Sequence, residues 1–230
     1  MESTHSKIIE LIGKKIISGY FPEGYIFSNR ETSGEDFGVS RTAIREVLKI
    51  LQSKGLIESR TKVGTAVRPK SDWNMLDPKV LEWRLKNPLQ NQNAMAELEE
   101  IRRAFEPKAA ALAAQYHNSE NIQKMMKALR GMAYSTEKED MAQCDVAFHT
   151  EIMKATNNSL YVAFGDLITV GLQNLILNDM EAAPVEVELW LSWHREIAEA
   201  IEQSNGELAE EKMLFLLNQT NHPADMILRS

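Results

Sequence analysis

Apolar residues recur at helical spacing along most of the chain, and only one short stretch departs from that pattern. Residues 5–18 carry the apolar face of a helix, a short helix is expected over 33–38, and a third over 40–55. Residues 56–60 and 65–69 then have the composition of two short strands around a glycine-containing turn. This order of elements predicts a winged helix-turn-helix domain.

From residue 75 onward the apolar pattern stays helical, without the alternation of strands. Asn, Gly, Ser and Pro residues separate the expected helices, which cover residues 77–86, 91–117, 119–133, 137–156, 159–179, 185–203 and 206–221. The fold class is therefore mainly α: a winged domain over 1–70, a linker with a short helix over 71–90, and an all-helical bundle of six to seven helices over 91–230.

Charge divides the chain in the same way as the apolar pattern. The formal net charge is -7, which by itself argues against a nucleic-acid-binding protein. Residues 1–70 nevertheless hold 12 basic and 8 acidic residues, a balance of +4, and the remaining residues hold 14 and 25, a balance of -11. A basic small domain joined to an acidic large one fits DNA binding by the first domain alone.

Composition narrows the class of protein further. The chain has no apolar run near the roughly 20 residues of a membrane helix, and its first residues lack the apolar core of a secretion signal. We therefore expect a cytoplasmic protein without a membrane partner. The single cysteine, Cys144, excludes an internal disulfide and a cysteine-rich zinc module.

The third expected helix has a basic stripe opposite its apolar stripe, with Arg41, Arg45 and Lys49 four residues apart. Such a helix can be offered to the major groove of DNA. The segments ISGYFPEG, FGVSRTAIREVLKILQSKGLIESR and GTAV, within residues 9–68, together resemble the winged helix of the GntR family of bacterial transcription regulators.

The resemblance implies contacts with double-stranded operator DNA. The residues assigned to DNA are Arg30, Ser40, Arg41, Thr42, Arg45, Lys62 and Gly64. Arginine suits guanine edges, whereas hydroxyl and backbone N–H groups at a helix start suit phosphates. The competing interpretation is a solvated face in which the arginines pair with acidic neighbours, namely Glu31, Glu35, Asp36 and Glu46.

The acidic domain contains a candidate metal site. Asp145 and His149 lie four residues apart, so a helix puts both on one face, where they could share a metal ion. His194 and Arg102 stand on other expected helices. An Asp/His pair alone is more often an ordinary surface hydrogen bond.

Three segments, EIRRAFEPKAAALAA, DVAFHTEIMKATNNSLY and WHREIAEAI, resemble the FCD ligand-binding domain of the FadR-type branch of the family over residues 95–217. Many FCD domains hold a divalent metal through an Asp and three His, and the metal and an arginine bind the carboxylate of a small effector. The resemblance assigns the metal to Asp145, His149 and His194, and the effector carboxylate to Arg102. Zinc is the expected metal, and nickel and manganese also suit these ligands.

The fourth metal ligand departs from the family pattern. Leu216 stands where the family's last histidine is expected. His222 lies six residues further on, about 240° around a helix, and would point elsewhere unless the helix breaks first. A site with three protein ligands remains chemically sensible, because water or effector oxygens can fill the vacant positions.

The linker DWNMLDPKVLEWRLKN resembles FadR-type regulators of sugar-acid catabolism, which suggests an aldonate or hexuronate as effector. Gln173 and Asn174 are candidates for contacts with effector hydroxyls, or else surface residues. The leading hypothesis is a homodimeric repressor of a sugar-acid or other organic-acid operon that binds a pseudo-palindromic operator and is not an enzyme. The alternatives are a regulator that responds to a fatty acyl or other non-sugar ligand without metal, and a metal-dependent hydrolase.

Overall fold

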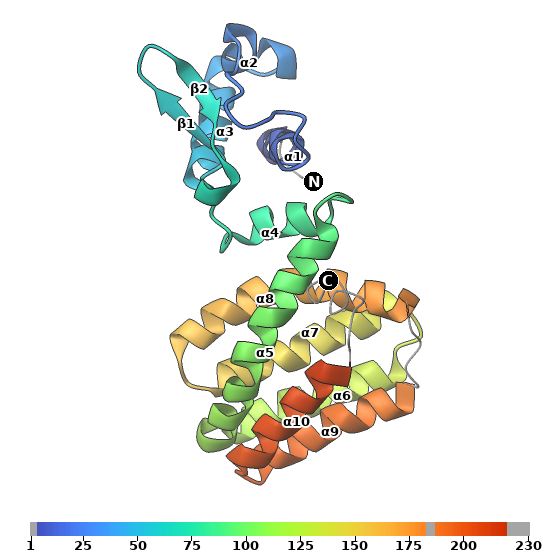
Figure 1. Ribbon diagram of the computed structural model, residues 1–230. Helices are drawn as coiled ribbons and strands as arrows, with labels where there is room; N and C mark the ends of the chain where they lie inside the picture. Colours follow the sequence, from blue (N-terminus) through green and yellow to red (C-terminus); the bar gives the residue numbers. More distant parts are fainter. Residues whose placement is uncertain (1–3, 183–186, 220–230) are drawn as a thin grey trace, which may run out of the picture. The chain divides into compact units, whose positions relative to one another are not determined.

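The structure, a computed structural model, describes residues 4–182 and 187–219; of residues 172–182 only the helical backbone is described. The chain divides into two compact units, Met1–Asn91 and Gln92–Ser230 (Figure 1). The segment 71–90, expected as a linker with a short helix, belongs to the first unit by its contacts.

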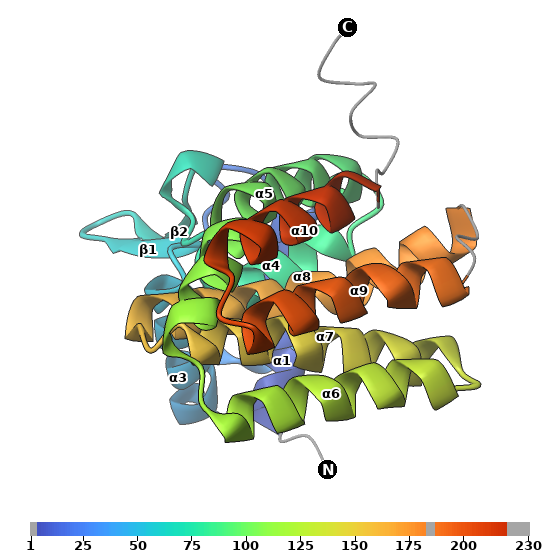
Figure 2. The ribbon, with the colours of Figure 1, turned by 90° about the horizontal axis from the view of Figure 1, so that it is seen from below.

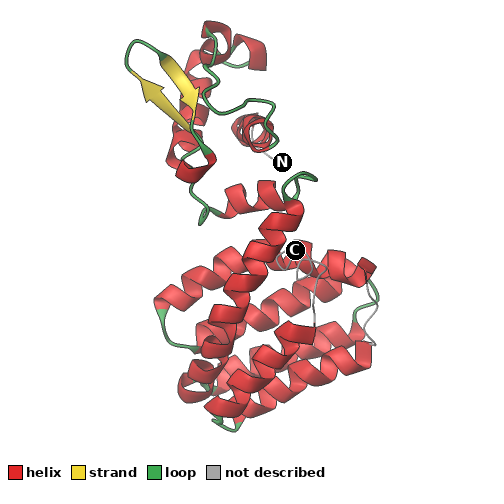
Figure 3. Ribbon diagram, in the orientation of Figure 1, coloured by secondary structure: helices red, strands yellow, loops and turns green. Residues whose placement is uncertain are grey.

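The first unit consists of short helices and one hairpin, the two strands drawn as yellow arrows in Figure 3. In chain order its elements are α1 Thr4–Ile17, α2 Asn29–Ser33, the 3₁₀ turn η1 Glu35–Phe37, α3 Arg41–Ser53, β1 Ile57–Arg60, β2 Gly64–Val67, the 3₁₀ turn η2 Lys70–Asp72 and α4 Pro78–Leu85. The winged helix-turn-helix expected from the sequence is confirmed.

The second helix begins earlier than the sequence pattern predicts. Ser28, not Ser33, caps it: the Ser28 hydroxyl accepts from the N–H of Glu31, and the Glu31 carboxylate accepts from the N–H of Ser28. This capping box fixes the start of α2, and Gly34, with a φ of 88°, ends it. The prediction of a helix over 33–38 is therefore wrong, since only the single turn η1 forms there.

The wing is a two-stranded antiparallel hairpin in which Ile57 pairs with Val67. An isolated bridge between Ile26 and Ala66 adds a third segment at its edge. At the tip, Lys62 has a φ of 66° and Gly64 a φ of 112°. The φ of 112° explains why position 64 is a glycine, because a side chain would be strained in that conformation.

The core of the first unit is built from α1, α3, the wing and α4. Its buried members are Ile8, Ile12, Ile16, Ile17, Phe21, Phe27, Ile44, Val47, Leu51, Leu56, Ile57, Val67, Val80 and Trp83. Trp83 lies so close to α1 that a Cβ at Gly13 would overlap its ring, and its indole N–H donates to Glu10 at 2.8 Å. The segment after the wing thus completes the core of the DNA-binding unit.

The second unit is helical throughout its described part, with six helices. They are α5 Asn91–Tyr116, α6 Ser119–Tyr134, α7 Lys138–Ala155, α8 Ser159–Ala182, α9 Val187–Glu202 and α10 Gly206–Gln219. Each agrees with the sequence expectation to within a few residues. Helix α6 packs against α7 and α9, as Figure 2 shows, while α7 also packs against α8 and α9 against α10. The expected all-helical bundle is confirmed.

The core of this bundle is aliphatic and rich in methionine and alanine. Its large buried members include Met125, Met132, Phe148, Ile152, Ile197, Ile201, Met213 and Leu216. Alanines of α5 (among them Ala109 and Ala113, both 0% exposed) allow close approach of neighbouring helices. No helix in the described ranges is both long and apolar enough to cross a bilayer.

Candidate metal centre and DNA-reading face

Helix α3 is held by its apolar stripe, which leaves its other face to solvent. Ile44, Val47 and Leu51 are all 0% exposed and belong to the core of the first unit. The Ser40 hydroxyl accepts from the N–H of Ala43 at 3.2 Å and fixes the start of the helix. Position and orientation of the exposed face therefore follow from the burial of the opposite one.

Arg41, Thr42 and Arg45 all lie on this exposed face of α3. Within the described part of the chain, neither of the two guanidinium groups forms an ion pair, whereas Lys49 on the same helix pairs with Glu46 at 2.8 Å. Two arginines without a partner among the described residues are available to bind an external anion such as a phosphate or to reach a base edge.

Arg30 differs from these two arginines because acidic neighbours bind it. Its Nε lies 2.9 Å from Asp36 Oδ1, and its Nη1 lies 3.9 Å from Glu35 Oε2. The hydrogen bond and the charge of Asp36 raise the pKa of Arg30. For Arg30, the interpretation as a paired surface residue agrees with the structure, and its contact with DNA stays a prediction.

The wing presents Lys62, in the turn between the strands, and Gly64, the first residue of β2, at its exposed tip. The lysine stands in a left-handed conformation that turns the chain there. A lysine at a wing tip can contact phosphate as a point charge without sequence discrimination.

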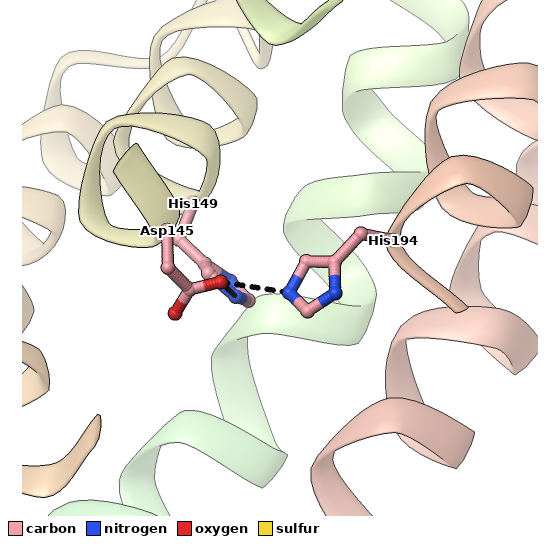
Figure 4. Close-up of side chains that lie close together, drawn as sticks. All are labelled: Asp145, His149 and His194. Carbon is pink, nitrogen blue, oxygen red and sulfur yellow. Dashed lines mark ion pairs between the residues drawn. The ribbon is translucent and has the colours of Figure 1, made fainter. Parts of the chain in front are cut away.

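In the second unit, Asp145, His149 and His194 form one buried group, shown in Figure 4. Helix α7 carries the first two residues one turn apart, and α9 carries the third. The three residues are 3%, 2% and 1% exposed, and one potential ligand atom from each lies within 4.8 Å of the others. The geometry brings together the three metal ligands expected from the sequence.

Both imidazoles direct Nε2 toward the same carboxylate oxygen. Asp145 Oδ1 lies 2.7 Å from Nε2 of His194 and 3.6 Å from Nε2 of His149. The other ring nitrogens face outward: Nδ1 of His194 lies 2.9 Å from the carbonyl oxygen of Trp190, and Nδ1 of His149 lies 2.5 Å from Oε2 of Glu106. The Trp190 carbonyl is the kind of acceptor that typically lies behind a metal-binding histidine. The contact between His149 and Glu106 is short, but in the described structure it does not have the direction of a hydrogen bond.

Buried polar atoms of this group fit a cation. In the described structure, Oδ1 of Asp145 and Nε2 of His194 make a short contact but no hydrogen bond of acceptable direction, and neither atom has a hydrogen-bond partner elsewhere. Buried polar atoms of this kind are costly unless something binds them. One carboxylate oxygen and two imidazole nitrogens are ligands that suit zinc, nickel or manganese.

Charges around the group keep its carboxylates ionised. Burial alone would raise the pKa of Glu106, but the charges of Arg102 and His149 outweigh burial and lower it to about 2. For Asp145, burial is again opposed by His149 and His194, and the pKa is lowered. An ionised carboxylate is the form that ligates a metal.

Arg102 is 5% exposed, and its Nε donates to Oε1 of Glu106 at 2.6 Å. Sequence reasoning assigned the arginine but missed Glu106, which is 0% exposed and touches both Arg102 and His149. The available signal was the four-residue spacing of Arg102 and Glu106, which puts them on one helix face.

Of the remaining candidates, only Leu216 has a described side chain. Leu216, at the position of the expected fourth ligand, is 2% exposed and packs in the core of the bundle. His222 and the side chains of Gln173 and Asn174 fall outside the described residues.

A winged helix-turn-helix followed by a helical bundle with a buried polar group defines a two-domain transcription regulator with a sensor domain. Residues 4–67 match the model of the bacterial regulatory proteins of the gntR family, and residues 97–219 match that of the FCD domain. The chain therefore belongs to the GntR family and carries an FCD domain. The GntR domain implies DNA binding, the FCD domain implies a small-molecule effector, and members are transcription regulators rather than enzymes.

Known proteins resemble the chain along most of its length. It is 28% identical to the galactonate operon transcriptional repressor of Escherichia coli K12 over 216 residues, covering 92% of each chain. It is 29% identical to the HTH-type transcriptional regulator YieP of the same organism over 205 residues, covering 88% of this chain and 87% of YieP.

Among solved structures, the protein Lar, described as controlling the agr system of Listeria monocytogenes, gives a TM-score of 0.66 at 17% identity. The match covers 100% of this chain and 98% of Lar. At this identity the likeness shows the fold alone.

Proposed function

We propose that the chain is a homodimeric repressor of an operon for the catabolism of a sugar acid, an aldonate or a hexuronate, or of another organic acid. The observation that carries the proposal is the buried group of Asp145, His149 and His194, whose ligand atoms lie within 4.8 Å of one another. Such a polar site suits the carboxylate of a small acid better than a long acyl chain. The name of the similar galactonate operon repressor, which refers to a sugar acid, supports this class of effector.

The three residues would hold a divalent cation, with zinc favoured over nickel and manganese. Three protein ligands leave coordination positions for water or for effector oxygens. The cation, when bound, would supply a positive charge to which the carboxylate of the effector can coordinate. The Trp190 carbonyl, 2.9 Å from Nδ1 of His194, would hold that ring for this role. The Glu106 carboxylate lies close to Nδ1 of His149.

Arg102 is the residue of this chain proposed to bind the effector carboxylate directly. Its guanidinium is buried and fixed by Glu106, so it is oriented before an effector arrives. Gln173 and Asn174 stay proposed contacts for effector hydroxyls.

In the DNA-binding unit, Arg41 and Arg45 would read base edges or bind phosphates from the exposed face of α3. Ser40 and Thr42 at the start of that helix would contact phosphate, and the wing would add Lys62 and Gly64. Arg30 would join them once it exchanges its acidic partners for phosphate. Two copies would bind two half-sites of a pseudo-palindromic operator. The effector would release the operator by binding another arrangement of the dimer more tightly.

A thermal-shift screen of sugar acids and simple carboxylates, run with zinc and with a chelator, tests the sensor part of the proposal. The expected hit raises the melting temperature of the zinc-loaded chain only, because its carboxylate needs the cation. His149→Ala should remove that shift while operator binding in a gel-shift titration persists.

Four outcomes contradict the proposal. A ligand that stabilises the chain equally with chelator present favours the metal-free alternative, and an acyl thioester as best hit favours the fatty acyl one. A His149→Ala variant that remains fully inducible excludes the buried group as the effector site. Sedimentation of the operator-free chain at the mass of a monomer contradicts the homodimer.

A further inference from the structure

Helix α8 carries few charges for its length. Its 24 residues include only three charged ones, two aspartates and one glutamate, whereas α9 and α10 are shorter and carry more. A helix with so little charge is normally covered on most of its surface. One side of α8 packs against α7, and the ring of Phe164 stacks on Phe105 of α5. The charge pattern therefore predicts a partner for the other side as well.

The other side of α8 carries an apolar heptad pattern, which we call the α8 seam. Its members alternate in steps of three and four residues, as the a and d positions of paired helices do, and they are Leu160, Ala163, Leu167 and Val170. Leu160 is 71% exposed, Ala163 is exposed, and the other two are half-buried. Gly165, where a Cβ would lie 3.1 Å from Met153 of α7, is about 180° around the helix from the seam. The seam thus points away from α7.

Aromatic and aliphatic side chains extend this surface from α8 onto α5. The rings of Phe105 and Phe164 are 4.7 Å apart and nearly parallel, and both residues are half-buried. Ile101, one turn before Phe105 on α5, is 40% exposed. Aromatic residues beside an apolar centre are typical of surfaces that bind another protein.

We propose that the α8 seam is the contact between two copies of this chain, with α8 of one copy packing on α8 of the other. The inference rests on the homodimer of the proposed function and names the surface that forms it. A two-fold contact brings the same patch of both copies together, so the patch must fit itself. An uncharged heptad seam meets this condition, because the a and d side chains of one helix fit between those of the other.

The charge of the chain after the winged domain favours the seam over other surfaces. Residues 71–230 hold 14 basic and 25 acidic residues, so two copies repel each other over most of their surface. The seam contains no charged residue. Leu214 and Phe215 on α10 are also exposed, at 41% and 45%, but Glu211 and Lys212 stand three residues before them. The seam is therefore the better place for two acidic domains to meet.

The seam belongs to a helix that packs directly on the helix of two candidate metal ligands. Helix α7 carries Asp145 and His149, and it packs against α8. Thr150, the neighbour of His149 in the chain, has its hydroxyl oxygen 3.2 Å from that of Thr169 on α8. A movement of α7 on effector binding would thus reach the contact between the two copies without crossing another element.

The experiment is sedimentation equilibrium of the full chain over a range of concentrations. Leu160→Glu places one carboxylate from each copy in the apolar contact and should raise the dimer dissociation constant by about 100-fold or more. The matched control is Leu214→Glu, the same change at an exposed leucine of α10; its dissociation constant should stay at the wild-type value.

Circular dichroism checks that each variant keeps its helices. If Leu160→Glu loses them, Ala163→Glu, at the next position of the seam, takes its place. A wild-type dissociation constant in the seam variant overturns the inference and leaves the homodimer standing, and so does an equal rise in Leu214→Glu. A wild-type chain that sediments as a monomer at every concentration overturns the inference and the homodimer together.

Discussion

Arginine has opposite environments in the two units of this chain. Arg41 and Arg45 are exposed on α3 and form no ion pair within the described residues, while Arg102 on α5 is 5% exposed and bound to a fully buried carboxylate. An exposed arginine costs the fold little and stays available to an external partner. A buried arginine must be paired inside the protein, and its partner holds the guanidinium group in one orientation.

The largest effect should follow from removing the buried member of this comparison. Arg102→Met leaves Glu106 buried without its cation, which costs about 3–5 kcal/mol of stability. Because the chain has two units, hydrogen exchange of amides in α5 and α7 should be followed in the presence of a chelator. Arg41→Met is the control and should stay within about 0.5 kcal/mol of the wild type. Equal protection of these amides from exchange in Arg102→Met and Arg41→Met would contradict the difference between the buried and the exposed arginine.

Arg45, an exposed arginine, should matter for operator binding and not for the stability of the fold. Arg45→Ala should weaken operator binding by about 1–3 kcal/mol, roughly 5- to 150-fold, if it reads a guanine edge. Gel-shift titration against an operator selected with the wild-type chain measures this. Lys49→Ala removes the same charge from the same helix, but its amine is already paired with Glu46, so a smaller loss is expected. Equal losses would indicate that only total charge matters.

Arg30 lies between the two extremes, since it is exposed yet paired. Asp36→Asn removes its closest partner, at 2.9 Å, and one negative charge from the DNA-facing unit. Surface ion pairs are worth about 0.2–1 kcal/mol, so operator affinity should rise by up to roughly fivefold. Glu120→Gln in α6, an exposed acid paired with Lys124, is the control and should leave affinity unchanged. A decrease in Asp36→Asn would mean that Asp36 holds Arg30 in its DNA-binding position.

The smallest effect is expected at the wing tip. Lys62→Ala should reduce the slope of log affinity against log salt by about 0.9, the value for one phosphate contact. The loss should be similar for specific and unrelated DNA, because a phosphate carries no sequence. An unchanged slope would remove Lys62 from the interface.

The sequence predicts the longer helices well because most of them have an apolar face and end close to Asn, Pro or Gly; α6, which ends before Ser135, is an exception. It fails at α2, a helix of 5 residues that is too short for periodicity; there the Ser28–Glu31 capping box was the available signal. The pairing of Arg30 with Asp36, six residues apart, depends on a turn whose shape the pattern does not specify.

Within the candidate site, the four-residue spacing of Asp145 and His149 predicts a shared face. Their meeting with His194 depends on how α7 and α9 pack, and only family resemblance anticipated it. Glu106 was missed for the same reason, because its contact with His149 crosses from α5 to α7. Contacts within one helix follow from spacing, while contacts between helices require the fold.

Trp83 packs so closely on Gly13 that a Cβ at this position would overlap its ring. This contact affects where the chain can be cut when one of its units is exchanged for that of another protein. Helix α4 follows the wing in the chain, yet it fills the core of the DNA-binding unit. A chimera that joins this unit to a foreign sensor should therefore be cut near Asn91, where the chain divides, and not directly after Val67. A cut at the wing would leave α1 with an uncovered apolar groove, and the grafted head would be prone to aggregation.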